Sequence, residues 1–457
     1  MYDLAVIGGG PGGYVAAGKA AGAGLKVVLF EKRELGGVCL NEGCIPTKTL
    51  LYSAKTLDNA KHADRYGVIV PEASVDFGAM LKRKVKVVKK LVGGVKVQMR
   101  NAGVEVVSGE AFIKGKAADE GFLISCADAE YQASNILVTT GSEAAVPPIP
   151  GLKEGLGTTV LTNREILAMD HIPESLVVIG GGVIGMEFAS LYNSLGSKVT
   201  VIEMLDKILG PMDREISDML QAQYAKKGVE FHLNCKVTAI DGNDVVYVDS
   251  DGSECRAQGC NILVSVGRRA NLQGFGLDNL GVELALNPAG KPYGIKVDEK
   301  MRTSVPGVFA AGDVTGFSML AHTASREGEV AVNTILGIED SMSYKAIPGV
   351  VYTNPEVAGV GLTEEEAARK GLAVEVKKLP MAFSGRFVAE NERGEGLCKV
   401  LLDPATRKVL GVHMLGNPCS EIISAACIAI DKGLAAEQLE AVVFPHPTVS
   451  EIFKETV

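Results

Sequence analysis

One glycine pattern occurs twice in this chain and constrains its fold more than any other feature: GGGPGG at residues 8–13 and GGGVIG at residues 180–185. In the first copy an apolar strand runs into Gly8, Gly10 and Gly13, a helix of small residues follows, and a second apolar strand ends at Glu31. Glycines at this spacing allow a tight turn, the approach of a pyrophosphate, and close packing of the helix on the strand. The order strand–turn–helix–strand–acid is typical of a dinucleotide-binding unit.

The second copy repeats the whole pattern with Gly180, Gly182, Gly185 and Glu203. In each copy the acid stands 23 residues after the first glycine, an agreement that glycines serving only helix–strand packing would not require. The sequence therefore predicts two dinucleotide-binding domains whose two cofactors face each other. Because Glu203 repels a 2′-phosphate and no arginine follows it in residues 203–210, NAD is favoured over NADP in the second domain.

Length and charge narrow the class of protein further. At 457 residues the chain is too long for one hydrophobic core, so several domains are expected. The net charge of −9 argues against nucleic acid as the main partner. Residues 81–100 are a basic exception, with apolar residues at helical spacing: Leu81, Val85, Val88, Val92, Val95 and Met99. We interpret this segment as a helix with a core-facing stripe and a solvated basic back, in preference to a site for a polyanion or a membrane.

No segment indicates export or membrane insertion. An apolar strand pattern begins directly after Asp3, which leaves no room for a secretory signal, and no charge-free apolar run is long enough to span a bilayer. The nine cysteines are dispersed along the chain, a usage typical of proteins whose thiols stay reduced. We therefore expect a cytoplasmic protein without a membrane span.

Two cysteines, Cys39 and Cys44, stand out in the stretch GGVCLNEGCIPTK at residues 36–48. A zinc site needs about four ligands, and no second pair matches this one, since Cys255 and Cys260 share the spacing but border a strand. No metal is expected. A purely structural disulfide would close a loop of few residues and remove little chain entropy. A redox-active pair is the preferred interpretation, since these cysteines follow directly on the first nucleotide unit.

This stretch resembles the active-site motif of the flavin-dependent disulfide reductases, the pyridine nucleotide-disulfide oxidoreductase family, and the resemblance covers essentially the whole chain. Further similar segments are VTTGSE (138–143), GVFAAGDVTG (307–316), MLAHTASREG (319–328) and YTNPEVAGVG (352–361). The resemblance implies FAD in the first domain and NAD in the second, with Asp313 on the ribityl chain. The cofactor-binding residues expected are Gly8, Gly10, Gly13, Glu31, Lys48, Thr140, Gly141, Gly312, Asp313, Ala321, Gly180, Gly182, Gly185, Glu203 and Gly267.

The implied fold class is α/β, with two Rossmann-like dinucleotide-binding domains and a C-terminal α+β dimerisation domain. We expect an FAD-binding domain at residues 1–142 and an NAD-binding domain at 143–268. Residues 269–340 would complete the FAD domain, and residues 341–457 would form the dimerisation domain. The active protein is then expected to be a homodimer.

The resemblance also implies the catalytic groups. His446, with Glu451 five residues on, is similar to the family's C-terminal base, which serves the other subunit and takes a proton from a dithiol. The thiolate would attack Cys39, and Cys44 would leave beside the flavin, with NAD⁺ as the final acceptor. Lys48 would lie near the flavin, paired with the acid that matches, Glu187. The alternative for that last pair is a helix-surface ion pair.

Within the family the chain most resembles the members that oxidise protein-bound dihydrolipoyl groups with NAD⁺. Glu203 disfavours the NADP-dependent glutathione and trypanothione reductases, and the lack of a cysteine after Cys427 disfavours mercuric and large thioredoxin reductases. Two features depart from the pattern: Phe444 stands where a second histidine is common, and residues 384–396 differ. The implied partner is a lipoyl-bearing protein of a 2-oxoacid dehydrogenase, acetoin or glycine cleavage system. The alternatives are a glutathione reductase-like enzyme and a non-catalytic flavoprotein that senses redox state or holds a complex together.

Overall fold

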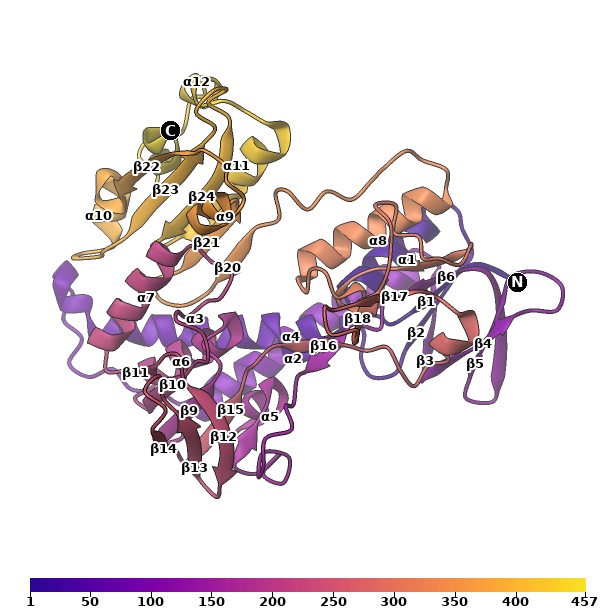
Figure 1. The fold of residues 1–457 in the computed structure, drawn as a ribbon, viewed down its shortest axis with the longest axis horizontal. Coiled ribbons are helices and arrows are strands. Elements are labelled where there is room, and N and C mark those ends of the chain that lie inside the picture. Colours follow the sequence, from indigo (N-terminus) through magenta and orange to yellow (C-terminus); the bar gives the residue numbers. More distant parts are fainter. The chain divides into compact units, whose positions relative to one another are not determined.

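The computed structural model describes all residues from 1 to 457, and they divide into two compact units (Figure 1). The first unit comprises Met1–Pro46, Lys82–Ala145 and Gly267–Ser343. The second comprises Thr47–Leu81, Val146–Val266 and Tyr344–Val457. Each contains one of the two glycine patterns. The division into four domains stays a prediction.

The first unit is built on one mixed sheet in the order β3-β2-β1-β6-β5-β4, with β19 also paired to β6. The strands β1, β2, β3, β6 and β19 pair in parallel, while β4 and β5 extend the sheet in antiparallel fashion. The four residues 4–7 of β1 are all buried, as expected of a parallel strand covered on both faces. The strand bounds are β1 Tyr2–Ile7, β2 Val27–Glu31, β3 Glu105–Ser108, β4 Ala111–Lys116, β5 Phe122–Cys126, β6 Ala129–Val138, β7 Ser142–Ala144, β16 Arg268–Ala270, β17 Leu284–Leu286, β18 Pro292–Ile295 and β19 Val308–Ala310.

Helices α1 (Pro11–Gly22) and α8 (Ala321–Ile335) pack side by side in this unit. Their approach depends on glycine, because a Cβ on Gly328 would lie 2.5 Å from the backbone oxygen of Gly12. The other helices that include residues of this unit are α2 Gly37–Glu42, α3 Cys44–Lys61 and α4 Phe77–Asn101. The small residues of α1 therefore serve helix packing as well as the turn that precedes it.

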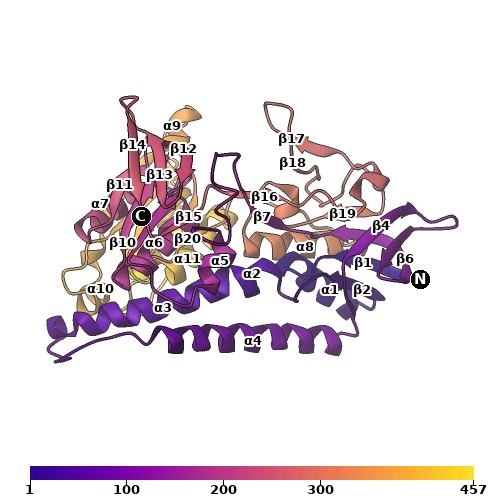
Figure 2. The ribbon, with the colours of Figure 1, turned by 90° about the horizontal axis from the view of Figure 1, so that it is seen from below.

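The predicted basic helix is α4, a long helix (Figure 2). Its apolar stripe is buried at Val92, Val95 and Met99, as the periodicity indicates. Val85, however, is 56% exposed, so the stripe is not continuous in the single chain. The difference has a simple cause: α1 covers the C-terminal end of α4, where a Cβ on Gly18 would lie 3.2 Å from the Met99 side chain.

The second unit contains a parallel sheet in the order β11-β10-β9-β15-β8 and a separate antiparallel sheet β12-β13-β14. The second glycine pattern lies between β9 and α6, as the sequence predicts. The bounds are β8 Val160–Leu161, α5 Asn163–Ala168, β9 Ser175–Ile179, α6 Val183–Ser194, β10 Lys198–Ile202, α7 Arg214–Lys226, β11 Glu230–His232, β12 Lys236–Asp241, β13 Asp244–Val248, β14 Glu254–Gln258 and β15 Asn261–Val264.

The C-terminal part of the second unit is an antiparallel sheet in the order β20-β21-β24-β23-β22, and α11 packs on β21 and β24. Buried Val, Leu, Ile, Cys and Met side chains of the sheet and of α11 form its core. The bounds are β20 Gly349–Val351, β21 Val357–Gly361, α9 Glu364–Arg369, β22 Glu375–Pro380, α10 Gly385–Glu390, β23 Leu397–Leu402, β24 Val409–Leu415, α11 Cys419–Lys432, α12 Ala436–Glu440 and α13 Glu451–Thr456. This α+β arrangement confirms the fold class expected for the C-terminal residues.

A buried ion pair joins the nucleotide sheet region to the C-terminal sheet within this unit. The Nζ atom of Lys399 lies 2.9 Å from Oδ2 of Asp213, and the two side chains are 2% and 0% exposed. Lys399 also pairs with Glu364 and Glu215. Burial alone would lower the pKa of Lys399, but these carboxylates raise it, so the ammonium stays charged.

Removing one partner of this pair is expected to destabilise the protein strongly. Lys399→Met leaves Asp213 buried without a counter-charge and should reduce the free energy of unfolding by about 3–5 kcal/mol. Denaturant-induced unfolding of the full-length protein measures this loss. Lys198→Met, at an exposed lysine, is the control and should change the free energy of unfolding by less than about 0.5 kcal/mol. A small loss at Lys399 would mean that water reaches Asp213.

Candidate active site

Two glycines of the first pattern are required by the backbone itself. Gly8 has φ of +111°, and a Cβ there would lie 2.3 Å from the backbone oxygen of Thr139. At Gly13 a Cβ would lie 1.9 Å from the oxygen of Gly8. These positions hold the tight turn and the close approach of α1 to β1, so any side chain would force the elements apart.

The second pattern has the same two requirements. Gly180 has φ of +101° and would place a Cβ 2.4 Å from the oxygen of Ser265, and Gly185 would place one 2.1 Å from the oxygen of Gly180. The middle glycines are different. A Cβ on Gly182 would meet nothing within 4 Å, and one on Gly10 would meet only Gly37, at 3.9 Å.

The open space beside Gly10 and Gly182 is the observation that tests the cofactor sites. Chain packing does not require glycine at either position, yet each lies at the N-cap of its helix, where free N–H groups favour an anion. A side chain there would fill the space that a pyrophosphate occupies. The residues present therefore fit a dinucleotide at both loops.

This difference between neighbouring glycines gives a matched pair of variants. Gly182→Ala should leave the melting temperature unchanged but raise the KM for NAD⁺ about tenfold, which corresponds to about 1.4 kcal/mol of lost binding. Gly185→Ala should instead destabilise the fold, because its Cβ overlaps the backbone oxygen of Gly180. Thermal melting and NAD⁺ titration of both variants separate the two roles. Equal melting temperatures for the two variants would contradict the division into a binding role for Gly182 and a packing role for Gly185.

The acid of each pattern braces its own glycine loop. Oε2 of Glu31 accepts the N–H of Gly9 at 2.8 Å, and Oε2 of Glu203 accepts the N–H of Gly181 at 2.6 Å. The other oxygen of each accepts the backbone N–H two residues on, at 2.8 Å in both cases. Sequence reasoning assigned these acids only to cofactor binding, and it missed this positioning contact because the pattern does not indicate which N–H groups the carboxylate meets.

The segment after β6 brings two further predicted positions together. Thr140 donates its hydroxyl to the backbone oxygen of Asn271 at 2.9 Å, and the Asn271 amide donates to the oxygen of Thr140 at the same distance. Gly141 has φ of +70° with open space beside its Cα. Gly267 has φ of +111° and also has open space beside its Cα. Asn271 was not predicted, and nothing in its local sequence distinguishes it.

Asp313 begins the short 3-10 helix η3 (Asp313–Thr315) after β19. Its carboxylate accepts a hydrogen bond from Ser142 and lies 3.8 Å from the Arg268 guanidinium, which itself donates to Ser142 at 2.7 Å. Asp313 remains 24% exposed. The Asp313 carboxylate is therefore held in one orientation by two groups that sequence reasoning missed.

The glycine before Asp313 is fixed by a buried acid. Gly312 has φ of +81° and donates its N–H at 2.6 Å to Oε2 of Glu327, a residue of α8 that is fully buried. Ala321 is the first residue of α8, and its role in cofactor binding stays a prediction. A glutamate inside a helix of small residues was the only sequence signal for Glu327.

The redox pair lies at the junction of two helices in the first unit. Cys39 is in α2, Cys44 is the first residue of α3, and both are partly buried. The loop that carries them is tied to the first glycine pattern, because Gly36 donates its N–H to the oxygen of Gly9 at 2.8 Å. A Cβ on Gly37 would lie 2.7 Å from the Cα of Gly10, so glycine is required there.

One tyrosine of α1, Tyr14, is within electrostatic reach of both cysteines. Burial raises the pKa of the Tyr14 phenol, and the charges of Cys39 and Cys44 raise it further. The phenol thus stays protonated. Cys44 also stands at the N-terminus of an 18-residue helix, where the helix dipole favours negative charge.

Lys48 and Glu187 form an ion pair in the second unit. The Lys48 ammonium lies 2.9 and 2.7 Å from the two oxygens of Glu187, and Glu187 is only 3% exposed, so this is not a surface pair. Oε1 of Glu187 also accepts the N–H of Tyr352 at 3.1 Å. The ammonium lies 4.6 Å from the centre of the Tyr352 ring. These contacts hold one positive charge in a defined place.

His446 and Glu451 form the third predicted pair, near the C-terminus. Nδ1 of His446 lies 3.0 Å from Oε1 of Glu451, and Oε2 of Glu451 accepts the N–H of Thr448 at 2.8 Å. These two contacts hold the pKa of Glu451 below its usual value, and the Thr448 N–H has the larger effect. The carboxylate therefore stays ionised. The His446 side chain is 81% exposed, which leaves Nε2 accessible.

Phe444, which replaces the second histidine expected here, is partly buried against the core of the C-terminal sheet. It anchors the segment that leads to His446 instead of adding a polar group.

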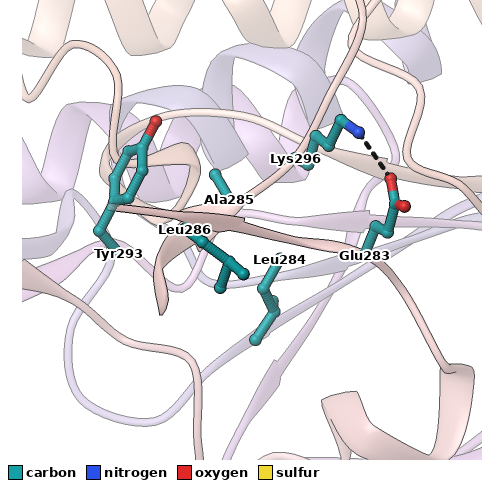
Figure 3. A pocket seen from close by; sticks show the side chains of 6 residues that line it. All are labelled: Glu283, Leu284, Ala285, Leu286, Tyr293 and Lys296. Carbon is teal, nitrogen blue, oxygen red and sulfur yellow. Dashed lines mark hydrogen bonds and ion pairs between the residues drawn. The ribbon is translucent and has the colours of Figure 1, made fainter. Parts of the chain in front are cut away.

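One surface pocket of about 680 Å³ lies elsewhere, on the hairpin of β17 and β18 (Figure 3). It is lined by Glu283, Leu284, Ala285, Leu286, Tyr293 and Lys296, and Lys296 pairs with Glu283 at 2.8 Å. None of the predicted site residues lines it. No group of three or more His, Cys, Asp or Glu side chains is arranged to hold a metal ion, and none of the helices is both long and apolar enough to cross a bilayer.

Known families match the two parts of the chain separately. The family described as "Pyridine nucleotide-disulphide oxidoreductase" matches residues 2–328, and the dimerisation domain of the same family matches residues 347–457. The chain belongs to the pyridine nucleotide-disulphide oxidoreductase family. This oxidoreductase uses FAD and NAD as cofactors. The second match assigns the C-terminal sheet to dimerisation and supports a homodimer.

Several curated proteins resemble this oxidoreductase over its full length. Dihydrolipoyl dehydrogenase of Chlorobaculum tepidum is 40% identical, covering 100% of this chain and 96% of its own, and that of Bacillus subtilis is 36% identical, covering 99% and 97%. Among solved structures, LpdA from Mycobacterium tuberculosis has a TM-score of 0.88 at 26% identity, covering 99% of this chain and 98% of its own. The flavoprotein disulfide reductase RclA from Escherichia coli has a TM-score of 0.85 at 28% identity, covering 100% and 99%.

Proposed function

We propose that this oxidoreductase oxidises dihydrolipoyl groups carried by a partner protein and reduces NAD⁺. The observation that carries the proposal is the position of Cys39 and Cys44 at the junction of two helices, in a loop tied to the first glycine pattern through the Gly36 N–H. The full-length relatives named dihydrolipoyl dehydrogenase support the choice of substrate. The lipoyl carrier belongs to a 2-oxoacid dehydrogenase, acetoin or glycine cleavage system, and the protein is cytoplasmic.

The residues of the chain carry out the thiol exchange. His446, from the second copy of the chain, takes a proton from one substrate thiol at Nε2, while Glu451 holds Nδ1 and stabilises the imidazolium. The substrate thiolate attacks Sγ of Cys39, the Cys39–Cys44 bond breaks, and Cys44 leaves as a thiolate. The second substrate thiol then attacks the sulfur joined to Cys39. This step releases the oxidised lipoyl disulfide and leaves the cysteine pair reduced by two electrons.

FAD, held by the first glycine loop and Asp313, supplies the route for these two electrons to NAD⁺ on the second glycine loop. Lys48 provides a fixed positive charge for the flavin. Glu187 and Tyr352 are its positioning residues, since they fix the ammonium through an ion pair and a ring contact.

NAD⁺ should be used in preference to NADP⁺ by about 100-fold or more in kcat/KM. Glu203 would face a 2′-phosphate, and bringing like charges together costs several kcal/mol. Glu203→Ala combined with Met204→Arg should narrow the ratio, because Met204 is 67% exposed and tolerates the longer side chain. Met204→Arg alone is the control and should change the ratio less. Equal kcat/KM for the two nucleotides in the unmodified protein would show that Glu203 is not the ribose acid.

Steady-state turnover of the FAD-loaded protein with free dihydrolipoamide and NAD⁺ tests the proposal directly. NADH should form at rates of the order of 1–10³ s⁻¹, the usual range for enzymes. If the protein turns over glutathione disulfide and NADPH but not dihydrolipoamide and NAD⁺, its activity is that of a glutathione reductase-like enzyme and the proposal is wrong. No turnover with either pair, in protein that retains FAD, would favour a non-catalytic flavoprotein.

A further inference from the structure

The most unusual surface of the molecule is the positive face of α4. Residues 77–104 contain no Asp or Glu but eight Lys and Arg side chains: Lys82, Arg83, Lys84, Lys86, Lys89, Lys90, Lys96 and Arg100. The whole chain carries a net charge of −9, so removing these eight positive charges leaves −17 for the rest. The protein is therefore a strongly acidic body with one basic strip.

The strip is exposed and lies along one side of the helix. Lys82, Lys86, Lys89, Lys96 and Arg100 are exposed and recur at spacings of three, four and seven residues, so they form one line along the helix that flanks the buried Val92, Val95 and Met99. From first to last they span about 27 Å at 1.5 Å per residue. Like charges this close destabilise an isolated helix, so a local structural role does not account for them.

Most of these charges have no counter-ion in the protein. Lys82, Lys86, Lys89, Lys90 and Arg100 make no ion pair. Lys96 does have a counter-ion, since its ammonium lies 2.8 Å from Oε2 of Glu34, and Arg83 and Lys84 also have interaction partners. Five of the eight positive charges therefore have no carboxylate partner, although the chain has an excess of carboxylates.

The Lys96–Glu34 contact also gives the strip its position. Glu34 lies in the segment between β2 and α2, the helix that carries Cys39. Within the first unit, the C-terminal end of the strip is therefore joined to the approach to the redox loop. A partner that binds the strip is brought next to the residues that exchange thiols.

We propose that the basic face of α4 is the docking surface for an acidic protein domain, the one that carries the dithiol substrate. This inference rests on the proposed function. Its chemical basis is charge complementarity: long lysine side chains neutralise carboxylates without requiring a fixed geometry and raise the association rate at low ionic strength.

A compact acidic domain fits this surface better than DNA or a membrane does. Both of those extend well beyond a strip about 27 Å long, so the −17 charge of the remaining protein would meet them with repulsion. A small domain can bind the strip and stay clear of the acidic surface, because charges are screened beyond about 8–10 Å at physiological salt.

The test is Lys86→Glu/Lys89→Glu/Lys90→Glu in the full-length, FAD-loaded protein. The probe is a reduced lipoyl domain of net negative charge, compared with free dihydrolipoamide. The variant should lower kcat/KM for the domain about 10- to 100-fold and flatten its dependence on salt, while free dihydrolipoamide changes by less than about twofold. Lys→Gln at the same positions should give an intermediate loss, and both Glu and Gln keep the helix.

The matched control is Lys116→Glu/Lys153→Glu/Lys291→Glu, which makes the same change in net charge at exposed lysines without ion pairs. It should leave turnover of the domain within about twofold. Equal losses for both triple variants would mean a general charge effect and would overturn the docking surface. So would an unchanged kcat/KM for the domain, or binding of α4 to duplex DNA or phosphatidylserine vesicles in its place. Failure of the unmodified protein to oxidise free dihydrolipoamide would instead overturn the proposed function.

Discussion

Serine in place of Cys39 or Cys44 is expected to reduce dithiol oxidation to the background rate while FAD stays bound. A serine oxygen cannot form or accept a disulfide, so no two-electron exchange with the substrate is possible. The FAD loop depends on Gly8, Gly10 and Gly13, whose geometry does not involve either sulfur. NADH formation from dihydrolipoamide and the visible flavin spectrum measure the two properties separately.

The two serine variants should differ in colour. With Cys39 replaced, Cys44 can remain a thiolate at the start of α3, and its charge beside the flavin should give a long-wavelength charge-transfer band. With Cys44 replaced, the band should be missing. Cys260→Ser, at an exposed cysteine outside the site, is the control and should keep full activity. The reverse pattern of colour would exchange the roles of the two cysteines.

Replacing His446 by alanine is expected to slow dithiol oxidation by about 10²- to 10⁴-fold, the usual contribution of a general base. Electron transfer from NADH to an artificial acceptor needs no proton from a thiol and should change little. His171→Ala is a matched control, since His171 is also exposed and also pairs with a carboxylate, Asp170, at 2.9 Å. A loss within severalfold at His446 would show that another group takes the proton.

The exposure of His446 in the single chain adds a second test. If the base serves the other subunit, co-expression of inactive Cys44→Ser and inactive His446→Ala chains should restore one working site in each heterodimer. Activity of the purified heterodimer, isolated through two different tags, is the measurement. A heterodimer that forms and stays inactive would contradict the exchange of bases between subunits.

The contacts of Glu451 set the direction of a pH effect. The pKa of the Glu451 carboxyl is lowered by the Thr448 N–H and by His446. This group therefore stabilises the folded protein at pH values above the pKa that Glu451 has in the unfolded chain, and the stabilisation is lost as the pH falls through its pKa in the folded protein. Glu451 therefore stays ionised beside His446 at the neutral and higher pH values at which thiolates form.

Several features of the site needed tertiary structure or a family resemblance. The Lys48–Glu187 pair joins residues 139 positions apart, and it was expected only because each residue matched a family motif. Asn271, Arg268 and Glu327 were missed, because each acts by bonding to a residue that is distant in the sequence. Neither helical nor strand periodicity carries information about such contacts.

By itself the sequence determined the two nucleotide-binding units, the redox pair and the basic helix. The reason is local: a tight turn, a close helix–strand approach and a helical charge strip each depend on residues within one short segment, so their spacing is visible in the chain. Only the tertiary structure decided that Glu31 and Glu203 brace their loops, that Val85 is exposed, and that Lys399 is buried among three carboxylates. Burial and hydrogen bonding there depend on which distant segments meet, and that is fixed by the packing of the whole unit.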